Sequence, residues 1–215
     1  MLGVDLPTLL IYTFVLVIAL PAHELAHAWA ADALGDPTPR SQGRLSLNPL
    51  VHLDLMGSLL LLFAGFGWAK PVQINPGILR RRSPAALMLV SAAGPLTNAA
   101  LALVAAIPFW FGFASEGIPP SESIPSPEEF LITFVLINLV LALFNLLPIA
   151  PLDGEEVLSF FLPPRARAAL AAVSPYGPFV LLGLILLGRF GEFDPLGWLI
   201  FNPAKWLTLH LLGWA

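Results

Sequence analysis

The sequence lacks cysteine altogether and has few charged residues. Charged side chains make up 11% of the 215 residues, whereas soluble domains carry about a quarter. Without cysteine, neither a disulfide framework nor a thiolate metal site is available. The net charge is −4, so a polybasic surface of the kind that binds nucleic acid is missing, and we expect no nucleic-acid partner.

Apolar residues dominate what is present, at 57% of the chain. Three long apolar runs read as helices, at residues 6–34, 84–113 and 130–147. At 1.5 Å per residue the first would be roughly 43 Å long, more than the ~30 Å hydrocarbon core requires. Shorter apolar segments lie at 55–66, 179–187 and 196–214. We therefore predict an all-α polytopic membrane protein embedded in a lipid bilayer.

The basic residues predict its orientation. If residues 55–66 dip into the membrane and return, residues 35–54 and 68–83 lie on one side, and the loop 114–129, which has no lysine or arginine, lies on the other. The first side then holds Arg40, Arg44, Lys70, Arg80, Arg81 and Arg82, and later Arg165 and Arg167. The positive-inside rule makes this side cytoplasmic. We predict a multi-pass protein of the cell membrane.

The strongest local signal is the sequence His23-Glu24-Leu25-Ala26-His27. On a helix, positions i and i+4 face nearly the same way, so both imidazoles can reach one Zn²⁺, and Glu24 can act as general base. The alternative is a buried histidine pair with a structural glutamate. Ionisable groups inside membrane helices are costly and usually functional, so we predict one zinc ion per chain, near the cytoplasmic end of the helix.

A third ligand must come from elsewhere in the chain. The spacings used by soluble zinc proteases supply no further histidine or glutamate, which leaves His52, Asp54 and Asp153. Asp153 follows two prolines that stop the third long helix, and irregular backbone at membrane depth is tolerated where it is buried or lines a cavity. This depth is similar to that of the two histidines and favours Asp153.

Taken together, the motifs resemble those of the site-2 proteases, which are intramembrane zinc metalloproteases, and specifically their compact bacterial branch without accessory domains. The matching pieces follow in order: HELAHAWAADALGD at 23–36, GRLSLNPLVHLD at 43–54, GWAKPVQIN at 67–75, AGPLTN at 93–98 and FNLLPIAPLDG at 144–154.

The resemblance implies a site and an activity. By it, His23, His27 and Asp153 bind zinc, and Glu24 activates the water. The implied reaction is hydrolysis of a peptide bond within or near the transmembrane segment of another membrane protein. Two alternatives from other classes remain: an inactive relative that binds membrane proteins, and a membrane protein that handles metal without hydrolysis.

The resemblance also implies an architecture. We expect one membrane-embedded domain over 1–215, with a three-helix transmembrane catalytic core at about 6–160. Short strand-like, membrane-associated segments are expected between the first two helices, at 43–47 and 70–75. Further apolar segments are expected at about 175–215.

Two asparagines and two glutamates are open to more than one reading. Asn98 and Asn145 belong to the matching motifs, and each is either an interhelical hydrogen-bonding residue or a contact for the substrate backbone or oxyanion.

Glu155 and Glu156 depart from the family pattern after Asp153. We interpret them as first-turn residues that suit a helix dipole; the alternative is that they disturb the metal site.

Overall fold

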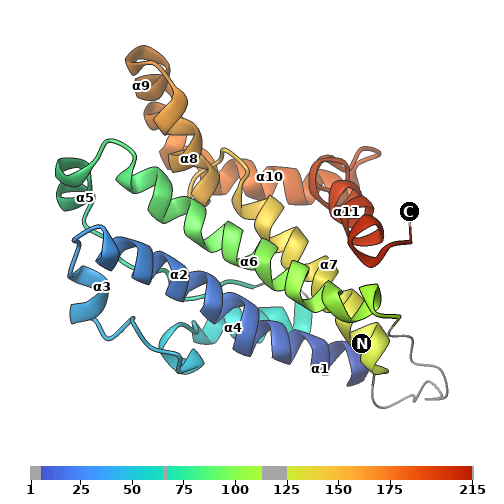
Figure 1. The fold of residues 1–215 in the computed structure, drawn as a ribbon. Helices are drawn as coiled ribbons and strands as arrows, with labels where there is room; N and C mark the ends of the chain where they lie inside the picture. Colours follow the sequence, from blue (N-terminus) through green and yellow to red (C-terminus); the bar gives the residue numbers. More distant parts are fainter. Residues whose placement is uncertain (1–5, 65–66, 113–124, 215) are drawn as a thin grey trace.

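The protein is mainly helical in the three stretches that the computed structural model describes, residues 6–64, 67–112 and 125–214 (Figure 1). Helices long and apolar enough to span a membrane cover Leu6–Ala33, Ala86–Trp110, Pro127–Asn145 and Pro164–Phe190. The expected all-α polytopic membrane protein is confirmed. Of the sequence expectations, residues 65–66, Phe113 and the loop 114–124 lie outside the described residues.

The first span is continuous but not uniform. It consists of α1 (Leu6–Phe14), a π-helical turn (Val15–Ala19) and α2 (Leu20–Ala33). In the π turn the Leu20 N–H donates to the Val15 carbonyl, five residues back, and Pro21 follows directly. Proline has no N–H, and its ring crowds the carbonyl four residues earlier, which a wider turn relieves. The span therefore passes Pro21 without breaking and continues to His23.

The second and third spans are α6 (Ala86–Trp110) and α7 (Pro127–Asn145). Helix α7 begins three residues before the expected position. Ser126 and Glu129 form a capping box around its first turn, and such a box satisfies backbone N–H groups that have no partner inside the helix. The apolar run begins only at Phe130, so the start of α7 predicted from that run was too late.

Helix α6 is the centre of the bundle and packs against both α2 and α7 (Figure 1). Its contact surface is rich in alanine: Ala102 and Ala106 are buried in one cluster with Val135 and Leu139 of α7. Small side chains let helix backbones approach closely, and this close packing is a main source of association energy between helices in lipid.

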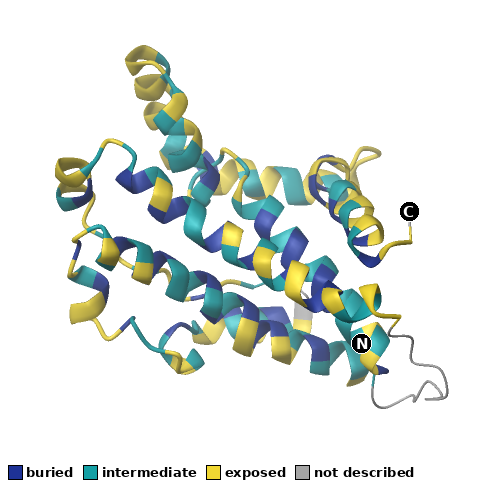
Figure 2. Cartoon of the chain, in the orientation of Figure 1, coloured by how far each residue is buried: buried dark blue, intermediate teal, exposed yellow. Residues whose placement is uncertain are grey.

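Many large apolar residues are exposed, and Figure 2 shows exposed positions along the long helices. Exposed examples are Val17 on the first span, Leu103 and Val104 on α6, and Leu182 on α10 (Gly177–Phe190). Apolar exposure on this scale marks a contact surface, and on helices of spanning length that surface suits lipid tails.

The link between the first two spans contains only short elements. These are α3 (Thr38–Ser41), a 3-10 turn (Pro49–Val51), α4 (Leu55–Ala64) and α5 (Pro76–Arg82). Helix α4 has 10 residues and is therefore about 15 Å long, half of what a crossing needs. This length suits the expected dip into the membrane and return.

The strand-like segments expected at 43–47 and 70–75 form no β ladder in the described part of the chain. A single antiparallel bridge pairs Leu53 with Ala69, and residues 70–75 run without regular pairing. We call residues 70–75 the extended segment. The prediction of strands at 43–47 and 70–75 is therefore wrong for the described residues, although both stretches are non-helical.

Side chains take the place of a partner strand. Arg44 donates to the first two carbonyls of the extended segment. The carboxylates of Glu24 and Asp36 accept its N–H groups at 72 and 75. Backbone groups that are bonded in this way are no longer available for a ladder, and this requirement for satisfied polar groups explains the missing strands.

The C-terminal part contains six elements: α8 (Asp153–Phe161), α9 (Pro164–Val173), a 3-10 turn (Ser174–Tyr176), α10, a π turn (Gly197–Phe201) and α11 (Asn202–Leu212). The apolar run expected at 179–187 lies inside α10, and with its flanks, over 164–190, it is long enough to span. Helix α11 packs against α7 and α6.

Three of the elements that carry basic residues gather at one end of the bundle. Arg40 lies in α3, α5 ends in three arginines, and Arg165 and Arg167 lie in α9. Figure 1 shows these three helices near the end where α2 finishes and α6 begins. These basic residues are therefore grouped at one end of the bundle, whereas Arg189 of α10 and Lys205 of α11 lie outside the group.

Candidate metal centre

Three side chains from distant parts of the sequence converge where α2 meets the start of α8. His23 and His27 lie one turn apart on α2, with their Nε2 atoms 3.0 Å apart. Asp153 is the first residue of α8, and its Oδ2 lies 3.2 Å from Nε2 of His23 and 3.4 Å from Nε2 of His27. The three donor atoms lie within 4.8 Å of one another.

The spacing of these donors fits a tetrahedral zinc ion. Ligand bonds of about 2.0–2.1 Å place any two ligands of such an ion roughly 3.3 Å apart. The three measured separations, 3.0, 3.2 and 3.4 Å, bracket that value. Two imidazoles and one carboxylate are also a donor set that zinc takes in catalytic sites, where a fourth position stays open. The residues present therefore fit the metal.

The backbone of α6 forms one wall of this site. A Cβ built on Gly94 would lie 2.4 Å from Nε2 of His27 and 2.5 Å from Nε2 of His23. Carbon and nitrogen atoms that are not bonded do not approach so closely. Glycine at 94 therefore leaves the space that the two imidazoles occupy.

Both histidines are oriented by hydrogen bonds at Nδ1. His23 Nδ1 lies 2.6 Å from Oδ1 of Asn98, and His27 Nδ1 lies 2.7 Å from the Val90 carbonyl oxygen. Carbonyl oxygens only accept, so each Nδ1 carries the proton and each Nε2 keeps its lone pair. This is the tautomer that a metal needs.

A chain of buried asparagines supports His23 from two further helices. The Asn98 amide nitrogen donates to Oδ1 of Asn138, at 3.0 Å, and the Asn138 amide donates to the Phe134 carbonyl, at 2.9 Å. Both asparagine side chains are fully buried. This arrangement favours the interhelical reading of Asn98. Asn138 was missed by sequence reasoning, although a lone asparagine in an apolar run is a signal that could have found it.

Asp153 reaches the histidines because the chain turns sharply after α7. A Cβ at Gly154 would be 2.2 Å from the Leu146 carbonyl oxygen, so the turn lies directly on the start of α8. Burial raises the pKa of the Asp153 carboxyl, but the adjacent His23 and His27 lower it by more, and the pKa lies below its usual value. A carboxylate is thus held against the two imidazoles.

Glu24 lies beside this site and is itself anchored. Its Oε2 accepts the N–H of Val72, in the extended segment, at 2.8 Å. The hydrogen bond joins α2 to the extended segment next to His23. A carboxylate that is held next to His23 and His27 can accept a proton from a water molecule bound among them.

The other two candidate ligands take different partners. His52 is fully buried, and its Nε2 lies 2.9 Å from the Ser46 carbonyl oxygen. Asp54 accepts the Gly57 N–H at 2.8 Å, in the first turn of α4. Neither residue belongs to the three converging donors. Asn145, at the end of α7, donates to the Leu141 carbonyl of its own helix.

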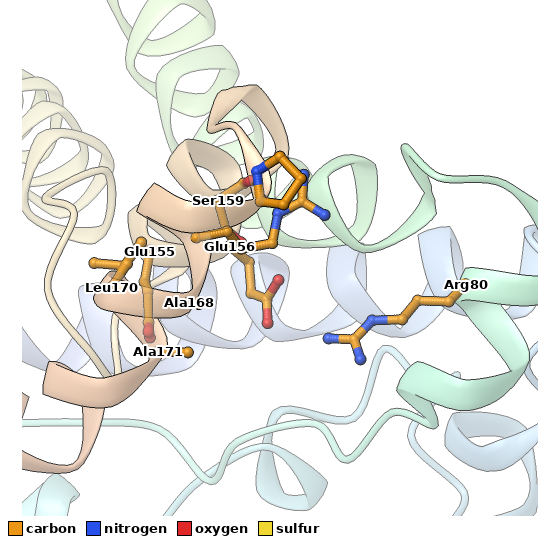
Figure 3. Close-up of a pocket in the computed structure, with 9 residues that line it drawn as sticks. Arg80, Glu155, Glu156, Ser159, Ala168, Leu170 and Ala171 are labelled. Carbon is orange, nitrogen blue, oxygen red and sulfur yellow. Dashed lines mark hydrogen bonds between the residues drawn. The ribbon is translucent and has the colours of Figure 1, made fainter.

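Glu155 and Glu156 make their own contacts in the first turn of α8, where acidic side chains suit the helix dipole. Glu155 accepts a hydrogen bond from the Ser174 hydroxyl. Glu156 faces Arg80 across a cavity of about 320 Å³ between α8, α9 and α5 (Figure 3). Neither glutamate belongs to the group formed by His23, His27 and Asp153, in keeping with the interpretation as first-turn residues.

Two histidines and an aspartate that fit a zinc ion, with a glutamate next to them on a helix of membrane-spanning length, are the arrangement expected of a membrane-embedded zinc peptidase. Sequence comparison agrees with this class. The model of peptidase family M50 matches residues 121–185. YwhC of Bacillus subtilis (strain 168), named as a candidate zinc metalloprotease, is 38% identical over 204 residues, which cover 92% of this chain and 89% of YwhC.

Two proteins called Rip2, also named as candidate zinc metalloproteases, are similar over most of the chain. The Mycolicibacterium smegmatis protein is 30% identical over 80% of this chain and 67% of its own length. The Mycobacterium tuberculosis (strain H37Rv) protein is 33% identical over 90% of this chain and 73% of its own length.

No solved structure matches the chain. The chain belongs to peptidase family M50, the site-2 proteases, and is a zinc metalloendopeptidase of multi-pass membrane type.

Proposed function

We propose that this metalloendopeptidase cleaves a peptide bond within or beside a transmembrane helix of another membrane protein. The observation that carries the proposal is the placement of His23 and His27 within a membrane-spanning helix, both buried, with their Nε2 atoms turned toward Asp153. A site at that depth is accessible to a substrate that is itself in the membrane.

We assign His23, His27 and Asp153 as the zinc ligands and Glu24 as the general base. The metal, when bound, supplies Lewis acidity toward a water molecule and the scissile carbonyl. Glu24 takes the proton from the attacking water and returns it to the leaving amine nitrogen. The bonds at Nδ1 of both histidines hold the imidazoles in place during these steps.

Of the two asparagines, Asn145 is the better candidate to donate to the oxyanion. The Asn98 amide is used by Asn138 and the Ala19 carbonyl. The Asn145 amide has two hydrogens and gives one to the Leu141 carbonyl. It lies at the end of α7, next to the turn that carries Asp153.

The extended segment is suited to hold a substrate backbone. A helical substrate hides its carbonyls in hydrogen bonds and must unwind before cleavage. Among the described residues, the N–H groups of Gln73 and Ile74 have no hydrogen-bond partner, so the segment keeps backbone donors with which an unwound substrate can pair by strand addition.

We place the active site near the cytoplasmic side of the cell membrane. Arg40, the arginines of α5 and those of α9 lie at the end of the bundle where α2 finishes, and basic residues favour the cytoplasm. All proposed site residues fall within 6–160, which we take as the catalytic core of a single membrane domain, with α10 and α11 beside it.

The test is a cleavage assay in which the natural substrate need not be identified first. The zinc-loaded protein is reconstituted in liposomes with a library of single-pass transmembrane peptides, and new N-termini are identified by mass spectrometry. We expect cuts within or next to the apolar segments, and none with Glu24→Gln, which keeps zinc. A zinc-loaded wild type that cuts nothing, or cuts equally well with Gln at 24, would refute the proposal.

A further inference from the structure

Arg44 is a buried arginine that binds backbone instead of a carboxylate. It is 4% exposed, and its guanidinium donates to the carbonyl oxygens of Val51, Lys70 and Pro71. A buried cation is costly unless its donors are satisfied, and the planar fork of arginine can reach several acceptors at once. Arg44 thereby joins the chain before α4 to the extended segment.

One of these carbonyls belongs to a peptide group that has a second partner. The Pro71 carbonyl oxygen lies 2.7 Å from Nη2 of Arg44, and the Val72 N–H donates to Oε2 of Glu24 at 2.8 Å. The carbonyl of residue 71 and the N–H of residue 72 form a single planar amide. A cation therefore binds one end of this amide and a carboxylate binds the other.

The two contacts reinforce each other. Donation to a carbonyl oxygen polarises the amide and makes its N–H a stronger donor. A hydrogen bond from that N–H to a carboxylate is charge-assisted, and such bonds are shorter and stronger than neutral ones. The hydrogen bond to Glu24 is thus strongest when Arg44 is in place.

We propose that Arg44 is a positioning residue for Glu24 and acts through the Pro71–Val72 peptide group. Arg44 fixes the amide, and the amide fixes one oxygen of the Glu24 carboxylate. The second oxygen has no hydrogen-bond partner among the described residues and is left to face the attacking water. The effect on catalysis rests on the proposed function, whereas the hydrogen-bonded chain can be tested without it.

The charge of Arg44 persists in this environment. Burial lowers the pKa of its guanidinium, and the nearby charge of Glu24 counters part of that shift. A guanidinium starts so far above neutral pH that it remains a cation. Glu24 is therefore close enough to interact with the arginine, although the peptide group lies between them.

A single spectroscopic signal can report on this peptide group. Proline followed by valine occurs once in the sequence, at 71–72. Protein labelled with ¹³C at the proline carbonyl and with ¹⁵N-valine therefore gives one carbonyl–nitrogen correlation. We expect Arg44→Met to move both the carbonyl carbon and the amide proton of this signal. Glu24→Gln should move mainly the amide proton, because it changes only the acceptor of the N–H.

Arg40→Met is the matched control. It removes an exposed arginine of the same loop, whose partner is Asp32, and it should leave the correlation in place. If Arg44→Met does not fold, Arg44→Lys carries the same test, because a lysine cannot bind three carbonyls in a fork. A folded Arg44 variant whose correlation is unchanged would overturn the proposal.

The consequence for catalysis is measured on the same variants with the transmembrane peptide library. We expect Arg44→Met to keep zinc and to lower turnover at saturating peptide by roughly 10–100-fold, the usual effect of losing a supporting hydrogen bond next to a metal site. KM should change little, and Arg44→Lys should recover part of the loss. Unchanged turnover, or loss of zinc together with turnover, contradicts a positioning role. If the correlation moves as expected but the wild type cuts no peptide, the link from Arg44 to Glu24 through the peptide group is supported and the proposed function is refuted.

Discussion

Gly94 of α6 and His27 of α2 are in such close contact that a Cβ on the glycine would lie 2.4 Å from the imidazole Nε2. The same atom would lie 2.5 Å from Nε2 of His23. The packing of α6 on α2 and the shape of the metal site are therefore set by the same contact.

Gly94→Ala should displace both imidazoles and weaken zinc binding by at least about tenfold. Overpacking a tight site costs about 1–3 kcal/mol, and here the atoms that must move are the proposed ligands. The zinc affinity is measured by competition with a chelator of known affinity.

Gly183→Ala on α10 is the matched control for this change. A Cβ at 183 meets no atom within 4 Å, so zinc affinity and cleavage should be those of the wild type. An alanine at 94 that binds zinc normally would show that the α6 backbone does not confine the histidines.

The zinc content of purified variants separates the three candidate ligands. Asp153→Ala should lose the zinc, because it removes one of only three protein donors. His52→Ala and Asp54→Ala should keep about one zinc per chain, because both side chains have other partners. Elemental analysis of the three proteins gives the answer, and zinc retained in Asp153→Ala would overturn the ligand set.

Asn138→Leu should weaken zinc binding although Asn138 does not touch the site. Its Oδ1 accepts the Asn98 amide, whose other end holds His23. Loss of such a supporting partner usually costs 10–100-fold in metal affinity or activity, so we expect a fall of roughly that size. The zinc affinity of the variant is measured by competition with a chelator, at a temperature where the variant is folded.

Asn145→Leu is the control for Asn138→Leu. Asn145 also lies on α7, but its amide bonds to its own helix, so zinc affinity should not change. An equal loss of zinc affinity in both variants would mean that any polar deletion on α7 loosens the bundle, and the asparagine chain would have no special role.

Val72→Pro should lower turnover while zinc stays bound. Proline removes the N–H that Glu24 accepts, and it also hinders pairing of a substrate with the extended segment. Val72→Ala keeps the N–H and should retain most activity. Cleavage of the transmembrane peptide library by both variants, together with their zinc content, tests this; equal turnover in the two would argue against any role for that N–H.

The first three spanning helices were predicted well from sequence because long apolar runs have few alternatives, whereas the fourth, Pro164–Phe190, was recognised only as a short apolar run at 179–187. The errors lie at the helix ends, whose positions depend on polar residues. The capping box of Ser126 and Glu129 places the start of α7 before its first apolar residue. The proposed metal donors were also anticipated, since His23 and His27 follow helix geometry and the depth of Asp153 followed from the prolines before it.

Features that depend on partners from elsewhere in the chain were not predictable. The extended segment has the composition of a strand, but Arg44, Glu24 and Asp36 take its backbone groups. No prediction was made for Asn138, because its hydrogen-bond partner Asn98 lies on another helix. In both cases the local sequence indicates the conformation or the polarity, but the hydrogen-bond partner comes from a distant part of the chain.

The bonds around His23 have a thermodynamic consequence. The proposed ligands come from α2 and α8, Asn98 comes from α6, and Asn138 comes from α7. Zinc binding and the association of these four helices are then linked equilibria, since an ion that binds only the assembled state stabilises it by mass action. Free zinc concentration thus acts as a variable in the assembly of the helix bundle, and chelation loosens the same contacts that hold the spans together.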